Sequence, residues 1–157
     1  MRASARLKAV SDMFTRGGVE IKQSNDIRRD VWQKLTLNAS GNTLAALTRI
    51  DLGGLGVDPG LCELAMNVMR EAIAVAAKQG WDLTAEMDVE KLAKRGKPGQ
   101  RPSMLQDVLA GRPTEIESIN GAVVVAAQRH GVRVPHTETL MQLVRLVQAQ
   151  SAHPQTP

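Results

Sequence analysis

The sequence predicts a mostly α-helical protein, and three observations lead to that prediction. Hydrophobic residues make up 43% of the 157 residues and aromatic residues only 2%, so the core must be built from aliphatic side chains. That composition suits packed helices better than a sheet, where aromatic and β-branched residues are favoured. Apolar residues also recur at helical spacing along most of the chain. Finally, Gly and Pro stand where these segments end and begin.

Length and composition also limit the class of protein. A chain of 157 residues can bury a sizeable core, and one domain is the default expectation. The single cysteine, Cys62, rules out an internal disulfide framework and fits a reducing compartment. The sequence shows neither an apolar run long enough to span a membrane nor a signal-peptide h-region. We therefore expect a soluble, cytoplasmic protein.

The first elements are predicted to be a helix and a short strand. Residues Ala3 to Thr15 follow a helical pattern that ends at Gly17-Gly18. Residues Val19 to Lys22 are a candidate strand. A second helix should then begin at a cap provided by Ser24 or Asp26.

This second helix is expected to give way near Gly41 and to be followed by a segment from Thr43 to Ile50. The stretch DLGGLGVDPG, residues 51–60, is predicted to be a turn region. Its glycines do not follow a strand in a GxGxxG pattern, so we do not expect a phosphate-binding loop there.

The longest helix should start near Asp58-Pro59, with Pro in its first turn, and run to Gln79, where Gly80 ends it. Much of its circumference is apolar, which indicates a central position. Glu71 lies among these apolar residues. It belongs either to the edge of the apolar face or to a functional site, because a buried charge needs a partner.

Two further helices are indicated by capping-box patterns. Ser103 is followed three residues later by Gln106, and Thr114 by Glu117 in the same way. Glycines follow each helix, at Gly111 and Gly131. A last amphipathic helix is expected over residues 137–150, and residues 151–157 are expected to form a disordered tail.

The densest basic stretch is KLAKRGKPGQR, residues Lys91 to Arg101. The simplest interpretation is a solvated connection rich in Gly and Pro, which we favour. An anion-facing loop for a carboxylate or phosphate is the second interpretation. Nucleic-acid binding comes third, because no aromatic residue is interleaved for stacking on bases.

The helix that opens at residue 24 or 26 carries an unusual second polar face. At 100° per residue, Lys34, Asn38 and Asn42 fall within roughly 80° of one another. This stripe is flanked by apolar residues, including Leu37 and Leu35. The opposite side is expected to be an ordinary solvent face, formed by Arg29, Gln33, Thr36 and Ser40.

Self-contained enzyme motifs are missing from the sequence, which has no GxSxG, HExxH or P-loop pattern. His130, His136 and His153 have no Cys or carboxylate at metal-ligand spacing, so we expect no metal site. From the residues alone, the polar stripe could be a structural hydrogen-bond seam or a ligand site.

Two blocks of the sequence resemble the C-terminal domain of the ketopantoate reductases (2-dehydropantoate 2-reductases). One block is WQKLTLNASGN and the other is RPSMLQDVLAGRPTEIESINGAVVVAAQRHGVRVP. Between them, REAIAVAAKQG places Glu71 and Gly80 where the family has an acidic helix residue and a following glycine. The resemblance covers nearly the whole chain from about Ser24 onward.

The resemblance implies a role for each unusual residue. Lys34 would be the general acid, and Asn38 and Asn42 would contact the substrate. Ser103, next to Arg101 and Pro102, would bind the substrate carboxylate. Glu115 would contact the lysine and the nicotinamide side of the cofactor.

Each assignment has a structural alternative. Ser103 could serve only as a helix cap. Glu115 could be an acidic residue favoured by the helix dipole, and Asn38 could bind backbone. For the general acid, we expect apolar neighbours such as Trp32 and Leu35 to desolvate Lys34 and lower its pKa. Gln100 and Arg101 depart mildly from the family pattern, where smaller or amide residues are frequent.

The resemblance further implies the all-α fold found at the C-terminus of 6-phosphogluconate-dehydrogenase-like enzymes, over residues 24–150. Residues 1–23 look like the last helix and strand of a nucleotide-binding domain whose remainder would be truncated or supplied by a partner. The implied function is the substrate-binding and catalytic half of an NADPH-dependent 2-dehydropantoate 2-reductase or related 2-keto acid reductase. We expect NADPH to bind the complete enzyme, but not this chain alone.

The alternative is a non-enzymatic helical module for dimerisation or binding that has lost its cofactor domain. The partners expected are a small 2-keto acid and a second copy of the chain in a homodimer. We expect neither nucleic-acid nor membrane partners.

Overall fold

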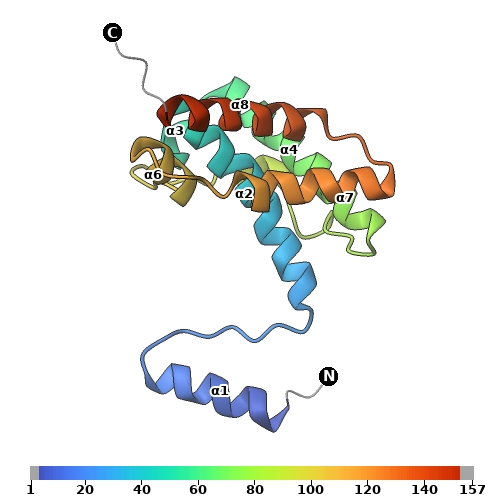
Figure 1. Ribbon diagram of the computed structural model, residues 1–157. Helices are drawn as coiled ribbons and strands as arrows, with labels where there is room; N and C mark the ends of the chain where they lie inside the picture. The colour runs from blue at the N-terminus through green and yellow to red at the C-terminus, as the bar shows by residue number, and fades with distance from the viewer. Residues whose placement is uncertain (1–3, 153–157) are drawn as a thin grey trace. The chain divides into compact units, whose positions relative to one another are not determined.

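The computed structural model describes residues 4–152, and the side chains of residues 4–150 (Figure 1). The chain divides into two compact units, residues 1–31 and 32–157, which are described separately. The predicted tail, residues 151–157, falls largely outside the described residues, as does His153. No helix in the described ranges is both long and apolar enough to cross a membrane.

The first unit contains helix α1, Ala5–Arg16, as the sequence predicts. The Ser4 hydroxyl caps it by accepting a hydrogen bond from the Leu7 amide, and Gly18 follows with a φ of +79°. The predicted strand at Val19 to Lys22 is wrong. The Val19 amide donates instead to the Phe14 carbonyl at the helix end, and residues 4–152 provide no neighbouring strand to pair with.

Helix α2, Ile27–Thr48, is one continuous element. The cap is Asp26, whose Oδ1 accepts from the Arg28 and Arg29 amides. The predicted break near Gly41 is wrong. Gly41 lies within the helix, and a Cβ at this position would come within 3.3 Å of the Leu52 side chain. The glycine therefore gives a neighbouring segment room to approach rather than ending the helix.

The predicted turn region contains the short helix α3, Leu52–Leu55, capped by Asp51. Helix α4, Pro59–Lys78, follows with Asp58 as its cap and Pro in its first turn, as predicted. At 20 residues it is slightly shorter than α2, which has 22, so it is not the longest helix. Helix α5, Val89–Ala93, comes next.

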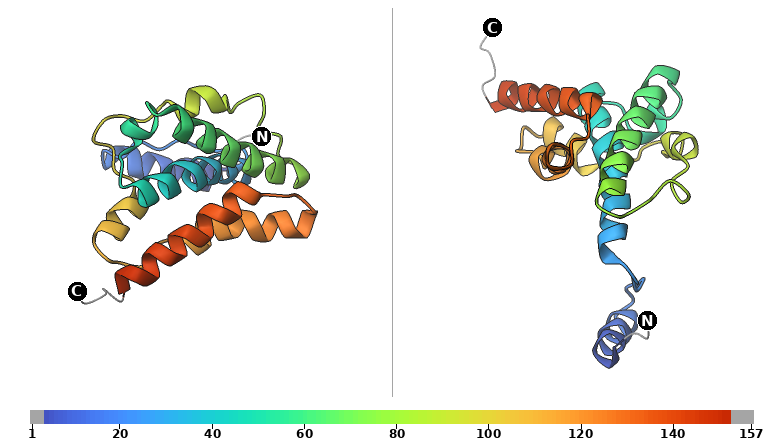
Figure 2. Two further views of the ribbon diagram at one scale, coloured as in Figure 1. Left: turned by 90° about the horizontal axis from the view of Figure 1, so that it is seen from above. Right: turned by 90° about the vertical axis from the view of Figure 1, so that its right-hand side faces the viewer.

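The C-terminal part contains four elements: α6 (Ser103–Leu109), the π-helical turn η1 (Glu117–Gly121), α7 (Ala122–His130) and α8 (Pro135–Ala152). In the second unit, α4 lies on one side of α2, and α7 and α8 lie side by side on the other (Figure 2). The core between these helices is aliphatic, as the low aromatic content predicts, and its largest fully buried side chains include Leu44, Met69, Leu83, Met104 and Ile116.

Neither predicted capping box forms. Pro102 is the cap position of α6, and Ser103 is already the first helical residue, so its hydroxyl makes no cap bond. At the second helix, the Thr114 hydroxyl and amide both donate to Gln148 Oε1 at 2.8 Å. Glu117 accepts two hydrogen bonds from Arg145 instead. In both cases a tertiary partner replaces the local one.

Glu71, left open between two roles by the sequence, stabilises the start of α8. Its carboxylate accepts hydrogen bonds from the backbone amides of His136 and Thr137, the Thr137 hydroxyl and the His136 ring, at 2.7–2.9 Å. An acidic group at a helix N-terminus is favoured by both the unpaired amides and the helix dipole. Glu71 is therefore a helix-capping residue supplied from another helix.

Candidate active site

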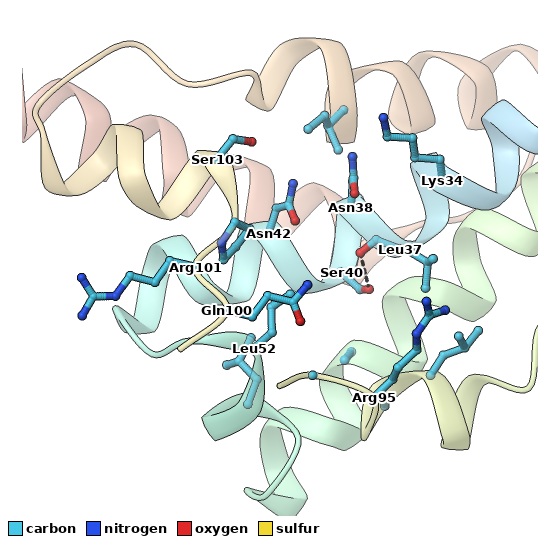
Figure 3. A pocket seen from close by; sticks show the side chains of 18 of the residues that line it. Lys34, Leu37, Asn38, Ser40, Asn42, Leu52, Arg95, Gln100, Arg101 and Ser103 are labelled. Carbon is cyan, nitrogen blue, oxygen red and sulfur yellow. Dashed lines mark hydrogen bonds between the residues drawn. The ribbon is translucent and has the colours of Figure 1, made fainter. Parts of the chain in front are cut away.

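Lys34, Asn38 and Asn42 line one cleft of the second unit, as their spacing on α2 predicts (Figure 3). Helix α2 forms the floor of this cleft. One wall consists of α6 and the segment that leads into η1, with Ser103, Glu115 and Ser118. The other wall consists of α3 and the loop of residues 95–101.

The polar residues of α2 fall into two groups that differ in hydrogen bonding. Thr36 and Ser40 are buried, and their hydroxyls donate to carbonyls of the preceding helical turn. The predicted solvent face is therefore wrong at these two positions. By contrast, the side chains of Lys34, Asn38 and Asn42 make no hydrogen bond or ion pair anywhere in residues 4–150.

This difference favours a ligand role for the stripe. Asn42 is only 9% exposed and Asn38 is half-buried, yet both amide groups are free to bind something in the cleft. The alternative in which Asn38 binds backbone is wrong. Polar groups at this depth normally have partners, so their free donors and acceptors mark where a polar ligand would fit.

Lys34 is exposed, contrary to the expectation that apolar neighbours desolvate it. Trp32 is 8% exposed and belongs to the core instead of covering the lysine. Trp32 and Lys34 are two positions apart, so they point about 200° from each other around the helix. Any desolvation of the ammonium group must come from what fills or covers the cleft.

Ser103 and Glu115 meet on the opposite wall. The Ser103 hydroxyl donates to Glu115 Oε2 at 3.4 Å, and both side chains are exposed. The structure thus brings together all five residues that the sequence singled out: Lys34, Asn38, Asn42, Ser103 and Glu115. Because Ser103 makes no cap bond, its hydroxyl is available to the cleft.

The basic stretch forms the second wall, which agrees with its less favoured interpretation as a loop that faces a ligand. Arg95 and Gln100 extend toward Leu37 and Ser40 at the edge of the floor, whereas Arg101 extends away from the other labelled side chains (Figure 3). Sequence reasoning did not identify Arg95 or Gln100 as site residues. The available signal was the loop's glycines, which allow close approach to a neighbouring element.

Asp51 holds this loop against α3. Its Oδ1 accepts from the Gly54 amide at 2.8 Å and its Oδ2 from the Gly99 amide at 2.7 Å. These two hydrogen bonds, that of Gly54 first, hold the pKa of the Asp51 carboxyl below its ordinary value of 3.8. The Leu52 amide adds a hydrogen bond to the Gln100 carbonyl.

Comparison with known proteins identifies the family. Residues 26–148 match the family described as "Ketopantoate reductase PanE/ApbA C terminal". The chain belongs to the ketopantoate reductase family. The match begins at Asp26, the cap of α2, and includes the cleft residues named above.

Curated relatives and solved structures agree with the family assignment. The chain is 34% identical over 148 residues to the 2-dehydropantoate 2-reductase of Archaeoglobus fulgidus, covering 94% of this chain and 50% of the relative. It is 35% identical over 147 residues to that of Halobacterium salinarum, covering 92% and 48%. The chain therefore spans about half the length of these ketopantoate reductases.

Among solved structures, a PanE/ApbA family ketopantoate reductase from Ralstonia eutropha JMP134 matches with a TM-score of 0.84 and 31% identity, over 96% of this chain and 51% of that one. A D-mandelate dehydrogenase solved with NADH and anilino(oxo)acetate has the same TM-score at 25% identity, over 94% and 63%. The predicted all-α C-terminal fold of the ketopantoate reductase family is confirmed.

Proposed function

We propose that this chain is the substrate-binding and catalytic half of an NADPH-dependent reductase that converts 2-dehydropantoate, or a related 2-keto acid, to the 2-hydroxy acid. The observation that carries the proposal is the set of unpaired polar groups of Lys34, Asn38 and Asn42 on the floor of one cleft. The names of the curated relatives support the first substrate. The similarity to a D-mandelate dehydrogenase supports including other 2-keto acids.

In this reaction Lys34 is the proton donor. Bound NADPH supplies the hydride that the keto carbon receives. As the C=O bond becomes a C–O single bond, negative charge develops on the oxygen, and an ammonium group placed there stabilises it and transfers one proton. The Lys34 ammonium is unpaired, so no ion pair has to break first.

Asn38, Asn42 and Ser103 orient the substrate in this proposal. The two amides offer donors and acceptors without adding charge, which suits hydroxyl and carbonyl groups of a small polar acid. The Ser103 hydroxyl can donate to the substrate carboxylate on the opposite wall. Its present acceptor, Glu115, is at 3.4 Å, a long distance for such a bond, so little is lost by exchanging partners.

The residues present fit the nicotinamide end of the cofactor only. Glu115 is an exposed carboxylate at the rim of the cleft, and it could accept a hydrogen bond from the carboxamide. In residues 4–152 no glycine-rich turn follows a strand, so nothing described here would hold the diphosphate. We therefore expect this chain alone to bind NADPH weakly.

The proposal is tested by supplying the nucleotide-binding half. The chain is fused to the N-terminal half of the Archaeoglobus fulgidus relative, and consumption of NADPH is followed with ketopantoate. We expect turnover that depends on ketopantoate and is lost in Lys34→Ala. If the folded fusion binds NADPH but reduces no 2-keto acid, the chain is instead a non-enzymatic helical module.

The free thiol of Cys62 is compatible with a cytoplasmic site for this reaction, because unpaired cysteines persist in reducing compartments.

A further inference from the structure

We propose that Arg95 forms an anion subsite in the wall of the cleft, and that it makes the cleft selective for 2-keto acids bearing a second anionic group. This inference rests on the proposed function, because it assumes that the keto-acid end binds at Lys34, Asn38 and Asn42. It adds a substrate class to that function: 2-oxo dicarboxylates rather than 2-oxo acids with an uncharged far end.

The position of Arg95 is the first argument. It follows α5 directly, after the last-turn residue Lys94, and its guanidinium group extends toward Leu37 and Ser40 (Figure 3). Leu37 adjoins the Lys34 stripe on α2. Arg95 and Gln100 therefore border the cleft floor on the side away from Ser103 and Glu115. A ligand whose keto-acid end occupies the stripe would have its other end near this side.

The second argument is that the loop is held in place. The Arg95 amide donates to the Leu92 carbonyl, and the Gly99 amide donates to Asp51. Gly96 lies so close to α3 that an added Cβ would collide with the Leu52 carbonyl oxygen. The backbone on both sides of Arg95 is thus anchored, and the side chain starts from a defined point.

The third argument is the balance of charge. Arg95 has no ion pair or side-chain hydrogen bond in the described part of the chain. Of the two carboxylates that line the cleft, Asp107 is paired with Arg112 at 2.7 Å, and Glu115 accepts from Ser103 on the far wall. Lys34 and Arg95 are therefore two cations not neutralised by the protein. One keto-acid group accounts for the first and leaves the second without a counter-charge.

The chemistry of arginine indicates a carboxylate as the group that pairs with it. A guanidinium presents parallel N–H donors that match the two oxygens of a carboxylate. Gln100, on the same wall, adds an uncharged amide that can donate to the same group. A 2-keto acid with a hydrocarbon far end would leave both groups in water and gain nothing from them.

The test titrates the chain with matched pairs of 2-oxo acids in a calorimeter. Oxaloacetate, 2-oxoglutarate and 2-oxoadipate are each compared with the monoacid in which a methyl group replaces the far carboxylate. We expect at least one dicarboxylate to bind about five- to tenfold more tightly than its partner, as one charge-assisted pair at an exposed site allows. Arg95→Met, which keeps the apolar stem, should abolish the difference.

The control is Lys94→Ala. Lys94 is exposed, precedes Arg95 directly and does not line the cleft, so this variant removes one positive charge from the same loop without changing the subsite. It should keep the preference for the dicarboxylate. Loss of the preference in both variants would mean that only the overall charge of the loop matters, and the assignment to Arg95 would be wrong.

Other outcomes separate this inference from the proposed function. Equal binding of both members of every pair would overturn the subsite and leave the reductase proposal intact. Binding of neither member would overturn both. If Arg95→Met weakened NADPH rather than the dicarboxylates, the anion would be a cofactor phosphate, and the inference about substrate class would be wrong.

Discussion

Exposure rises along the polar stripe of α2, from Asn42 at 9% through half-buried Asn38 to exposed Lys34. The deeper residues are therefore suited to holding a ligand, and the outermost to reacting with it. An exposed lysine is a weaker proton donor at neutral pH than a desolvated one, because burial lowers the pKa of an ammonium group. Covering the cleft would thus do for Lys34 what its helical neighbours do not.

At this scale the first prediction concerns Lys34. In a chain completed with a nucleotide-binding half, Lys34→Ala should lower kcat by about 10²–10⁴-fold, the usual contribution of a general acid. The melting temperature should change little, because the side chain is exposed and unpaired. Steady-state kinetics and thermal melts of the same preparations check both parts. Near wild-type kcat with reduced stability would show that the stripe is structural.

Asn38→Ala and Asn42→Ala should act differently. Each removes a group that binds substrate before and during the reaction, so KM should rise with a smaller change in kcat. Since neither amide has a protein partner, the truncations leave no buried group unpaired, and the variants should fold. A kcat loss as large as that of Lys34→Ala, with KM unchanged, would contradict the binding role.

At the scale of elements, a buried asparagine connects η1 to α2. Asn120 is fully buried; its Oδ1 accepts from the Thr43 hydroxyl at 2.8 Å, and its Nδ2 donates to the Ala39 carbonyl at 3.1 Å. Ala39 and Thr43 flank the stripe in sequence. This contact therefore sets the position of the cleft floor relative to the wall that carries Glu115.

Asn120→Ala should lower the free energy of unfolding by about 1–3 kcal/mol, because it leaves the buried Thr43 hydroxyl without its acceptor. The Thr43→Val variant removes the other partner, and the double variant should cost less than the sum of the two single changes. Urea unfolding of the four proteins gives this coupling. Strict additivity would mean that the hydrogen bond contributes nothing.

Asp51 makes the order of the basic loop dependent on pH. Its folded-state pKa is lowered by the Gly54 and Gly99 amides, so its stabilisation is fully present above its ordinary pKa of 3.8 and is lost as the pH falls through the lower folded value. We expect the Gly99 amide resonance to shift only in that acidic range. In Asp51→Asn, which cannot accept from both amides, the shifted position should be seen at neutral pH as well. A Gly99 resonance that titrates near neutral pH would contradict the assignment.

Sequence patterns predicted these elements well wherever the determining interactions are local. Asp26, Asp58 and Gly18 act within one helical turn, and each does what its residue type suggests. The patterns failed where a distant partner decides. Gly41 reads as a helix end because its neighbour Leu52 is not visible in the periodicity, and the capping box at Thr114 is displaced by Gln148.

The same distinction applies to the site. The 100° spacing of α2 was enough to place Lys34, Asn38 and Asn42 on one face. It could not show which polar residues of that helix stay unpaired, because Thr36 and Ser40 bond within the helix and disappear into the core. Nor could it show that residues 95–101 face the cleft, since that depends on α3 and Asp51.

At the scale of the whole molecule, apolar side chains left on the surface suggest association. The exposed apolar residues of α1 are Leu7, Val10, Met13 and Phe14, and none of its described residues is buried. Apolar faces of this kind tend to be covered by a partner. We predict a homodimer at micromolar concentration, measured by sedimentation. Replacing Met13 and Phe14 with Ser should shift the population toward monomer, and a purely monomeric wild-type chain would contradict the prediction.

The π-helical turn at Glu117–Gly121 has an evolutionary consequence. Its hydrogen-bonded ring contains one more residue than that of an α-helix, so it behaves as a single-residue insertion in the helix that continues as α7. Deleting one residue there would restore the α-helical register and turn the preceding segment by about 100° relative to α7. Glu115 would then leave the cleft while α7 kept its packing. A lineage that lost this residue could therefore keep the fold and lose one wall of the site in a single genetic step.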